Sequence, residues 1–231
     1  MCGRYNLTLP VEALIELFEF SERPNLMPRY NIAPTQEIPV VRPKPEGGRQ
    51  LTLMRWGLVP SWSKEVAKSA PMINARSETV ATKPSFRTAF RDRRCLVPAT
   101  GYYEWRTDPS GKQPFHITSA AGGVLAFAGI WETWRNPAEP EAPLLLSCAL
   151  MTTTPTAELS AIHDRMPVIL PRFQWDVWLD PATAPEDLTA LLKPYTAEKL
   201  SAYPISSRVN AVRNEDADII KPLADPAPRL I

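Results

Sequence analysis

Glycine is scarce in this chain, with nine residues among 231, whereas there are 26 prolines. The sequence holds no glycine-rich phosphate loop, dinucleotide fingerprint or serine nucleophile elbow, so the usual motifs of NTPases, dinucleotide enzymes and serine hydrolases are missing. Proline stands at more than twice its ordinary frequency of about 5%. Together with 44% hydrophobic residues, this composition favours long, rigid and ordered connections over disorder.

Cysteine and histidine are also few. Neither the cysteines (Cys2, Cys95 and Cys148) nor the histidines (His116 and His163) show metal-ligand spacing, so we expect no metal site and no cofactor. An odd cysteine count without framework spacing indicates a reducing compartment. Cys95 and Cys148 lie in apolar runs and are predicted to be buried free thiols.

The chain lacks both an excess of charge and long apolar runs. Its net charge is +1, so any nucleic-acid site must come from local clustering of basic residues. No apolar stretch approaches the roughly 20 residues of a membrane span. The first residues lack the basic and apolar regions of a secretory signal. We therefore expect a cytoplasmic protein with no membrane partner.

Strand-like segments outnumber helix-like ones and do not alternate regularly with them, which favours an α+β fold over a doubly wound sheet. No repeat or linker is evident, so a single domain over residues 1–231 is predicted, with a tail from about 215 to 231 wrapping the surface. Thr8 is predicted to cap the first helix. The expected helices are 9–20, 83–91, 156–162, 172–179 and 185–193, and the expected strands are 38–42, 51–56, 94–98, 101–105, 114–118, 124–131, 144–151, 166–170 and 201–209.

The chain begins with Met1 and Cys2, and the small side chain of Cys2 favours removal of Met1. Removal would leave an amine and a thiol two carbons apart. The amine condenses with an aldehyde to an imine, and the thiol then closes a five-membered thiazolidine ring in an intramolecular step. Both groups titrate not far above neutrality, near pH 8 and about 8.5. Arg4 is predicted to lower the thiol pKa or to hold an anion beside it.

One stretch of the chain concentrates basic residues. They neutralise several phosphates if they line a groove, although a solvated helix face explains them almost as well. Aromatic side chains nearby offer stacking surfaces for unpaired bases. The basic residues are Arg76, Lys83, Arg87, Arg91, Arg93 and Arg94, and the aromatic ones are Trp56, Trp62 and Phe86.

Three short segments carry candidate catalytic groups. Asn74 precedes Arg76 and Glu78, where the alternatives are a phosphate-binding turn or a cap with an Arg76–Glu78 pair. Glu104 lies among aromatic residues, and it is either a buried proton-transfer group or an exposed edge carboxylate. His163 lies in a polar loop, where catalytic residues are common, whereas His116 lies in a strand-like run and is interpreted as structural.

Seven segments in this order resemble the SRAP family, the SOS-response-associated peptidases also called abasic-site processing proteins. They cover roughly residues 1–180, and their ordered occurrence is far more specific than any one motif. The resemblance implies a compact, mostly antiparallel and barrel-like β core with peripheral helices and a positively charged groove. The segments are Met1-Cys2-Gly3-Arg4-Tyr5, Arg29 to Gln36, Arg55 to Trp62, Asn74-Ala75-Arg76-Ser77-Glu78, Arg94 to Pro98, Gly101-Tyr102-Tyr103-Glu104-Trp105 and His163-Asp164-Arg165-Met166-Pro167.

The resemblance also implies a function in the DNA damage response. Family members bind single-stranded DNA that contains an abasic site, and the aldehyde of the opened sugar reacts with the N-terminal cysteine to give a thiazolidine crosslink that protects the lesion. Carried onto this chain, the catalytic residues are Cys2, Asn74, Glu104 and His163. The DNA-binding residues are Arg4, Asn31, Pro34, Trp62, Arg76, Arg87 and Arg165. No metal is implied, and we expect a monomer.

Two other functions stay open. The first is a cysteine peptidase with Cys2 as nucleophile and His163 as base, and the family name implies self-cleavage that exposes the cysteine. The second is a single-stranded nucleic-acid binding module that needs the basic and aromatic residues but not Cys2, Glu104 or His163.

Overall fold

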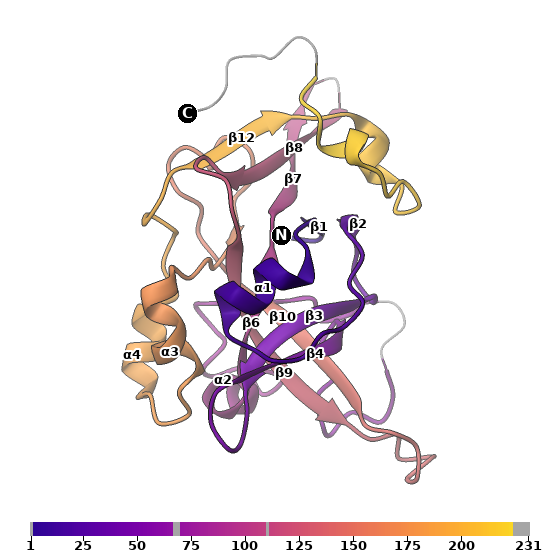
Figure 1. Cartoon of the computed structure of the whole chain (residues 1–231), viewed down its shortest axis with the longest axis vertical. Helices are drawn as coiled ribbons and strands as arrows, with labels where there is room; N and C mark the ends of the chain where they lie inside the picture. Colours follow the sequence, from indigo (N-terminus) through magenta and orange to yellow (C-terminus); the bar gives the residue numbers. More distant parts are fainter. Residues whose placement is uncertain (1, 67–69, 110, 224–231) are drawn as a thin grey trace.

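In the computed structural model, which describes residues 2–66, 70–109 and 111–223, two β-sheets are stacked along the long axis (Figure 1). The fold is α+β and mostly antiparallel, as predicted. The larger sheet closes on itself, because β9 (Leu125–Trp134) pairs with both β6 (Arg94–Ala99) and β10 (Leu145–Thr153). Its closed path runs through β10, β4 (Arg49–Trp56), β3 (Glu37–Pro43), β6 and β9. The expected barrel-like core is thereby confirmed.

Two short strands extend from β10 at the edge of this barrel. β5 (Asn74–Arg76) runs parallel to β10, and β11 (Met166–Pro167) runs antiparallel to it. Thr152 of β10 lies between these two strands, since it pairs with Arg76 on β5 and with Pro167 on β11. The segments around Asn74 and His163 are therefore brought to one end of β10.

The smaller sheet carries the start of the chain. Its order is β12 (Leu200–Pro204), β8 (Gly111–Ser119), β7 (Gly101–Asp108), β1 (Tyr5–Leu7) and β2 (Arg29–Ile32). β1 lies against the barrel as well, because the Tyr5 ring makes edge contacts with Trp56 at 5.4 Å and with Phe127 at 6.1 Å between centroids. The N-terminal segment is therefore held between the two sheets.

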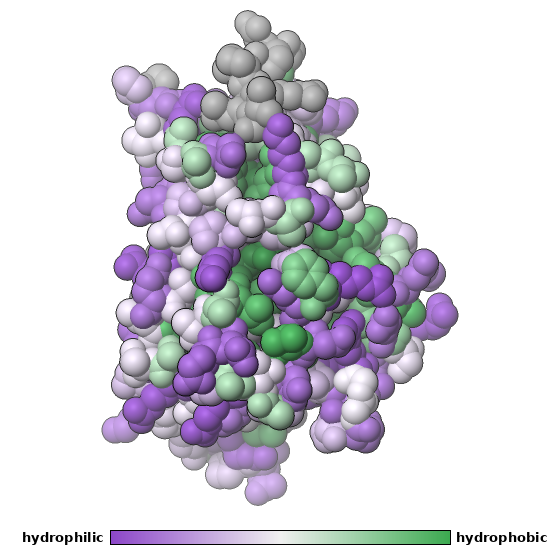
Figure 2. Space-filling view, turned by 90° about the vertical axis from the view of Figure 1, so that its left-hand side faces the viewer, coloured by the Kyte–Doolittle hydropathy of each residue, from purple (hydrophilic) through white to green (hydrophobic). Residues whose placement is uncertain are grey.

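The helices are short and peripheral. In the view of Figure 1, α3 and α4 lie beside the barrel, and Figure 2 shows this face, on which apolar groups gather between polar ones. The Phe18 ring of α1 stacks on Trp175 of α3 at 4.5 Å, which anchors both helices to the core. The helical segments are α1 (Val11–Phe18), α2 (Arg87–Asp92), η1 (Arg172–Gln174), α3 (Trp175–Leu179), α4 (Pro185–Ala190), η2 (Ser207–Asn210) and η3 (Ala217–Ile220).

Several local predictions need correction. Pro10, not Thr8, occupies the N-cap of α1, and the Thr8 backbone N–H donates to Thr100 Oγ1 instead. Residues 156–162 form successive turns rather than a helix. The strand expected at 201–209 ends at Pro204, after which the chain turns into η2. The Thr8 N–H is thus used by a tertiary contact, whereas residues 156–162 keep hydrogen bonds within the segment, such as Ile162 N–H to the Leu159 carbonyl, that do not continue as a helix.

The C-terminal segment (residues 205–223) packs on the smaller sheet. The Glu215 carboxylate accepts hydrogen bonds from the backbone N–H groups of Tyr30 and Asn31, the latter at 2.9 Å. Ile205, Val209 and Ile219 are buried there with Tyr103. The start of the predicted tail thus lies on the surface of β2 and β7, while residues 224–231 lie outside the described residues.

The three cysteines are buried and reduced, which confirms the prediction for Cys95 and Cys148. Within the described ranges, no helix has the length and apolar character needed to cross a bilayer. The same residues contain no group of three or more His, Cys, Asp or Glu side chains arranged to hold a metal ion.

Candidate functional site

Cys2 lies beside β7, close to Glu104. The pairing of β1 with β7 continues to the Arg4 carbonyl, which accepts the Tyr103 N–H at 3.0 Å. Cys2 is completely buried. Burial raises the thiol pKa well above its usual value, and the Glu104 charge raises it further. The predicted lowering by the Arg4 side chain is not seen; the charge of the N-terminal amine and the Arg4 backbone N–H, which bonds to Cys2, oppose the rise.

Asn74 ties Cys2 to the barrel. Its Nδ2 donates a hydrogen bond to the Cys2 carbonyl oxygen at 2.8 Å. Asn74 is held in place by the pairing of β5 with Leu150 on β10, so it is a strand residue and not a helix cap. Its Oδ1 is buried and accepts no hydrogen bond from the described residues. This atom is suited to accept a hydrogen bond from a bound ligand or an amine.

Glu104 is buried, with only 2% of its surface exposed, so the alternative of an exposed edge carboxylate does not hold. Burial raises its pKa from 4.5 to about 7. A carboxyl group of this kind takes up and releases protons near neutral pH, which is the property of an efficient general acid or base.

The imidazole of His163 reaches Glu104 from the loop before β11, with Nε2 at 3.8 Å from Glu104 Oε2. Burial lowers the pKa of His163, which favours the neutral form of the ring. Nδ1 lies 3.0 Å from the backbone N of Arg165, whose N–H donates to it in the tautomer that carries the ring proton on Nε2, toward Glu104. The exposed carboxylate of Asp164 lies 3.0 Å from the same Nδ1.

Two residues expected at the groove have internal partners. Arg4 Nη1 donates to Asn31 Oδ1 at 2.7 Å and to the Val209 carbonyl at 2.8 Å. Asn31 is fully buried, and its amide donates to three carbonyls of the C-terminal segment, including that of Asn214 at 2.8 Å. These bonds lock the first residues of the chain onto residues 209–214.

Arg165 also has internal partners. Its guanidinium forms a fork with Glu78, with Nη2 at 3.0 Å from Oε2, and donates to the Thr152 carbonyl at 2.6 Å. Glu78 thus pairs with Arg165 and not with Arg76, and the Arg76 side chain is exposed. The pair with Glu78 holds the loop of His163 against β10.

The basic stretch divides into two groups. Arg94 is buried and donates to the Trp178 carbonyl at 2.7 Å, while Arg93 and Arg91 pair with Glu132 and Asp92. Arg76, Lys83 and Arg87 are exposed instead. The other expected groove residues are Trp62, which is 66% exposed, and Pro34, which is partly exposed in the turn between β2 and β3.

Two hollows adjoin the cluster of Cys2, Asn74, Glu104 and His163, which we call the reactive cluster. One, of about 220 Å³, includes Asn74 together with Lys83 and Phe86. The other, of about 440 Å³, includes Glu104 and His163 and is completed by Trp105, Thr107, Lys112 and Asn210. Lys112 and Asn210 were not predicted, because nothing in the local sequence indicates that they meet Glu104.

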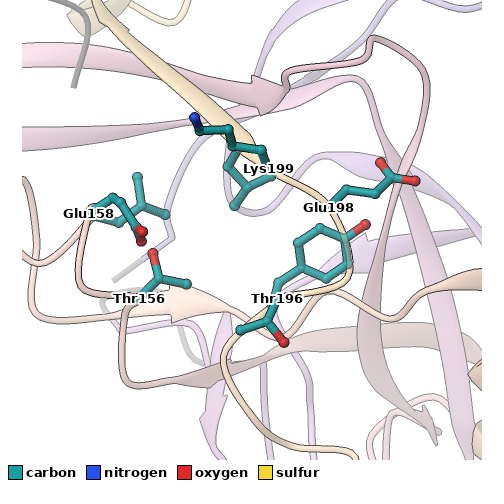
Figure 3. A pocket seen from close by; sticks show the side chains of 8 residues that line it. Thr156, Glu158, Thr196, Glu198 and Lys199 are labelled. Atoms are coloured by element: carbon teal, nitrogen blue, oxygen red, sulfur yellow. The ribbon is translucent and has the colours of Figure 1, made fainter. Parts of the chain in front are cut away.

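A third hollow, of about 300 Å³, is lined by none of the residues of the reactive cluster, and Figure 3 shows it from close by. Glu158, Glu198 and Lys199 line it together with Thr156 and Thr196. Two carboxylates against one ammonium group make it unfavourable for a phosphate backbone.

Known proteins resemble this chain along nearly all of its length. The abasic site processing protein YoqW of Bacillus subtilis is 40% identical over 226 residues, covering 96% of this chain and 99% of YoqW. The abasic site processing protein HMCES of Gallus gallus is 30% identical, covering 96% and 78%. A solved structure from Bacteroides thetaiotaomicron has a TM-score of 0.85 at 24% identity, over 96% of this chain and 100% of that one, so it shares the fold. Residues 1–212 match the family model described as SOS response associated peptidase (SRAP), and the chain belongs to that family.

Proposed function

We propose that this protein captures abasic sites in single-stranded DNA by forming a thiazolidine with Cys2 after removal of Met1. The observation that carries the proposal is the reactive cluster, in which the Cys2 carbonyl is bound by Asn74 and the thiol lies near the buried carboxyl of Glu104. The names of YoqW and HMCES, abasic site processing proteins, support the same substrate.

The reaction joins two groups of Cys2 to one carbon. The α-amine adds to the sugar aldehyde, and loss of one water gives an imine. The Sγ–H bond then breaks as Sγ adds to the imine carbon, and the imine nitrogen gains a proton. The product therefore equals protein plus DNA minus one water, and no oxidant, metal or cofactor takes part.

Glu104 is the proposed proton carrier. Because burial keeps the Cys2 thiol protonated, a base must take the Sγ proton during ring closure, and a carboxyl with a pKa of about 7 suits that task. His163 holds its Nε2 toward Glu104 and the sugar, where it assists opening of the sugar ring. Asn74 fixes the direction of Cys2, and its open Oδ1 receives a hydrogen bond from the amine or the sugar.

The proposed DNA path uses the exposed residues near Asn74. Arg76, Lys83 and Arg87 contact phosphates, Trp62 stacks on a base, and Pro34 lines the groove. Arg4 adds positive charge next to Cys2 and is held there by Asn31, whereas Arg165 acts by positioning the His163 loop. The single-domain, cytoplasmic and monomeric states stay predictions.

The test mixes the processed protein with an abasic single-stranded oligonucleotide and with an undamaged oligonucleotide of the same sequence. We expect a band that survives denaturing electrophoresis for the abasic strand alone, with an intact mass that shows the loss of one water. Cys2→Ala should give no such band, whereas Cys95→Ala, which alters another buried cysteine, should keep it.

The same experiment separates the other functions. A cysteine peptidase would hydrolyse a peptide substrate in a Cys2-dependent manner and leave abasic DNA uncoupled. A binding module would retain abasic DNA in a native gel and yield no covalent product from the wild-type protein. Either result would overturn the crosslinking proposal.

A further inference from the structure

The cleft beside Glu104 and His163 lies where β1 stops covering β7. The last backbone hydrogen bond between β7 and the segment that leads into β1 joins Tyr103 to Arg4, and the cleft begins at the next residue of β7, Glu104. Its volume of about 440 Å³ falls in the range of small-molecule sites. The cleft is therefore continuous with the reactive cluster, yet most of its lining has no task in the crosslinking reaction.

Three sheet residues share a face of this cleft. Trp105 and Thr107 are two positions apart on β7, and Lys112 of β8 pairs directly with Thr107. The neighbouring cation Arg106 is paired with Asp108 at 2.8 Å. Lys112 is exposed, and it is the one lysine or arginine among the described residues that line the cleft.

Asn210 closes the cleft from the C-terminal segment. Its Oδ1 accepts the indole N–H of Trp105 at 2.8 Å, which fixes the amide and leaves the Nδ2 hydrogens to donate elsewhere. The preceding residue, Val209, is buried and receives Arg4 at its carbonyl, so the backbone at Asn210 is anchored. A cation, an oriented amide donor and an aromatic ring thus meet at one place.

We infer that this cleft is a subsite for one nucleotide next to the lesion, with Lys112 binding its phosphate and Asn210 its base beside the Trp105 ring; the inference rests on the proposed function. A strand whose abasic sugar reaches Cys2 must place a neighbouring nucleotide close to the reactive cluster. Phosphate meets Lys112, and every base offers a ring face and hydrogen-bond acceptors. The Glu158 and Glu198 hollow of Figure 3 has a lysine as well, but its carboxylates disfavour the same ligand.

The experiment measures equilibrium binding of an oligonucleotide with a central tetrahydrofuran, an abasic analogue without an aldehyde, by fluorescence anisotropy over a salt series. Lys112→Met should lower the slope of log affinity against log salt by about 0.7, the value of one phosphate contact on a single strand. Asn210→Ala should weaken binding without changing that slope. Lys199→Met, the matched control in the third hollow, should behave like the wild type.

Two shortened oligonucleotides, each ending at the analogue on one side, locate the contact. The Lys112→Met defect should vanish for one of them and persist for the other. An unchanged slope with the full oligonucleotide, or a defect that persists with both shortened ones, overturns the subsite. Crosslinking of the aldehyde-bearing strand by the wild type is scored separately, so loss of the proposed function and loss of the subsite are distinguishable. Thermal unfolding of each variant confirms that it is folded.

Discussion

Asn74 and Cys2 are 72 positions apart, yet the side-chain amide of the first donates to the backbone carbonyl of the second at 2.8 Å. The bond joins Cys2 to β5, which is itself fixed to the barrel by its parallel pairing with β10. The direction of the Cys2 backbone is thus set by the barrel as well as by β1. We therefore expect Asn74 to control the geometry of Cys2 rather than the affinity for DNA.

Replacing Asn74 by Ala should slow crosslinking by roughly 10- to 100-fold, because a small displacement of a reacting group costs a rate factor of this size. Affinity for the tetrahydrofuran strand should change less than 3-fold, a limit of roughly 0.7 kcal/mol. Single-turnover gels and anisotropy give the two values. Asn136→Ala, in the surface loop after β9, is the matched control. Equal losses of rate and affinity would contradict the geometric role.

Glu104→Gln should remove a pH dependence that is centred on the Glu104 pKa of about 7. Because the carboxylate form accepts the thiol proton, the ratio of wild-type to variant crosslinking rate should rise with pH from 5.5 and level off above about 8. Taking the ratio cancels the titration of the amine, which both proteins share. A ratio that stays constant across this range would show that Glu104 does not act as the base.

The same substitution should stabilise the fold at high pH. Burial places the folded-state pKa of Glu104 above its unfolded value. The contribution of Glu104 to the free energy of unfolding is therefore fully present below pH 4.5 and is lost as pH rises through about 7. The loss is on the order of 3 kcal/mol. In urea unfolding, the free energy of unfolding of Glu104→Gln should rise relative to that of the wild type between pH 5 and pH 8. The exposed control Glu158→Gln should show no such gain.

Arg76 and Arg165 share a charge but should respond differently to replacement. Arg76→Ala should lower the salt slope of DNA binding by about 0.7 and leave the free energy of unfolding within about 0.5 kcal/mol. Arg165→Met removes a buried partner of Glu78 and of the Thr152 carbonyl, so it should cost about 1–3 kcal/mol of stability. Urea unfolding measures the stability of both variants, and the binding assay measures their salt slopes. An Arg165 variant with wild-type stability would refute its positioning role.

Much of the strand arrangement follows from the sequence, because β-branched and aromatic runs between turn residues mark strands wherever they lie. Local turns were less predictable. Residues 156–162 have helix-like apolar spacing, with Leu159 and Ile162 buried, but the chain there makes separate turns that direct His163 toward Glu104. The local sequence pattern does not show that this loop has to place His163 beside Glu104.

The candidate site was predictable only in part. Motif resemblance indicates Asn74, Glu104 and His163, and the structure brings them together at Cys2. The resemblance does not indicate that the Arg94 guanidinium donates its hydrogen bonds to buried carbonyls, because a run of basic residues looks the same in the sequence whether it is buried or exposed. Nor does it reveal the pairing of Trp105 with Asn210, which lies 105 positions away. Contacts of this span depend on the completed fold.

The position of the amine gives the last prediction. A five-membered ring needs the α-amine and Sγ on the same residue, so a protein with an unremovable residue before Cys2 should form no stable adduct, although its thiol is unchanged. Cys2→Ser keeps the free amine and should give only an imine, which hydrolyses during denaturation unless it is first reduced with borohydride. Intact mass after denaturation, with and without reduction, distinguishes the three proteins. The processed wild type alone should give a borohydride-independent adduct, and a blocked protein that captures DNA at the wild-type rate would rule out thiazolidine formation.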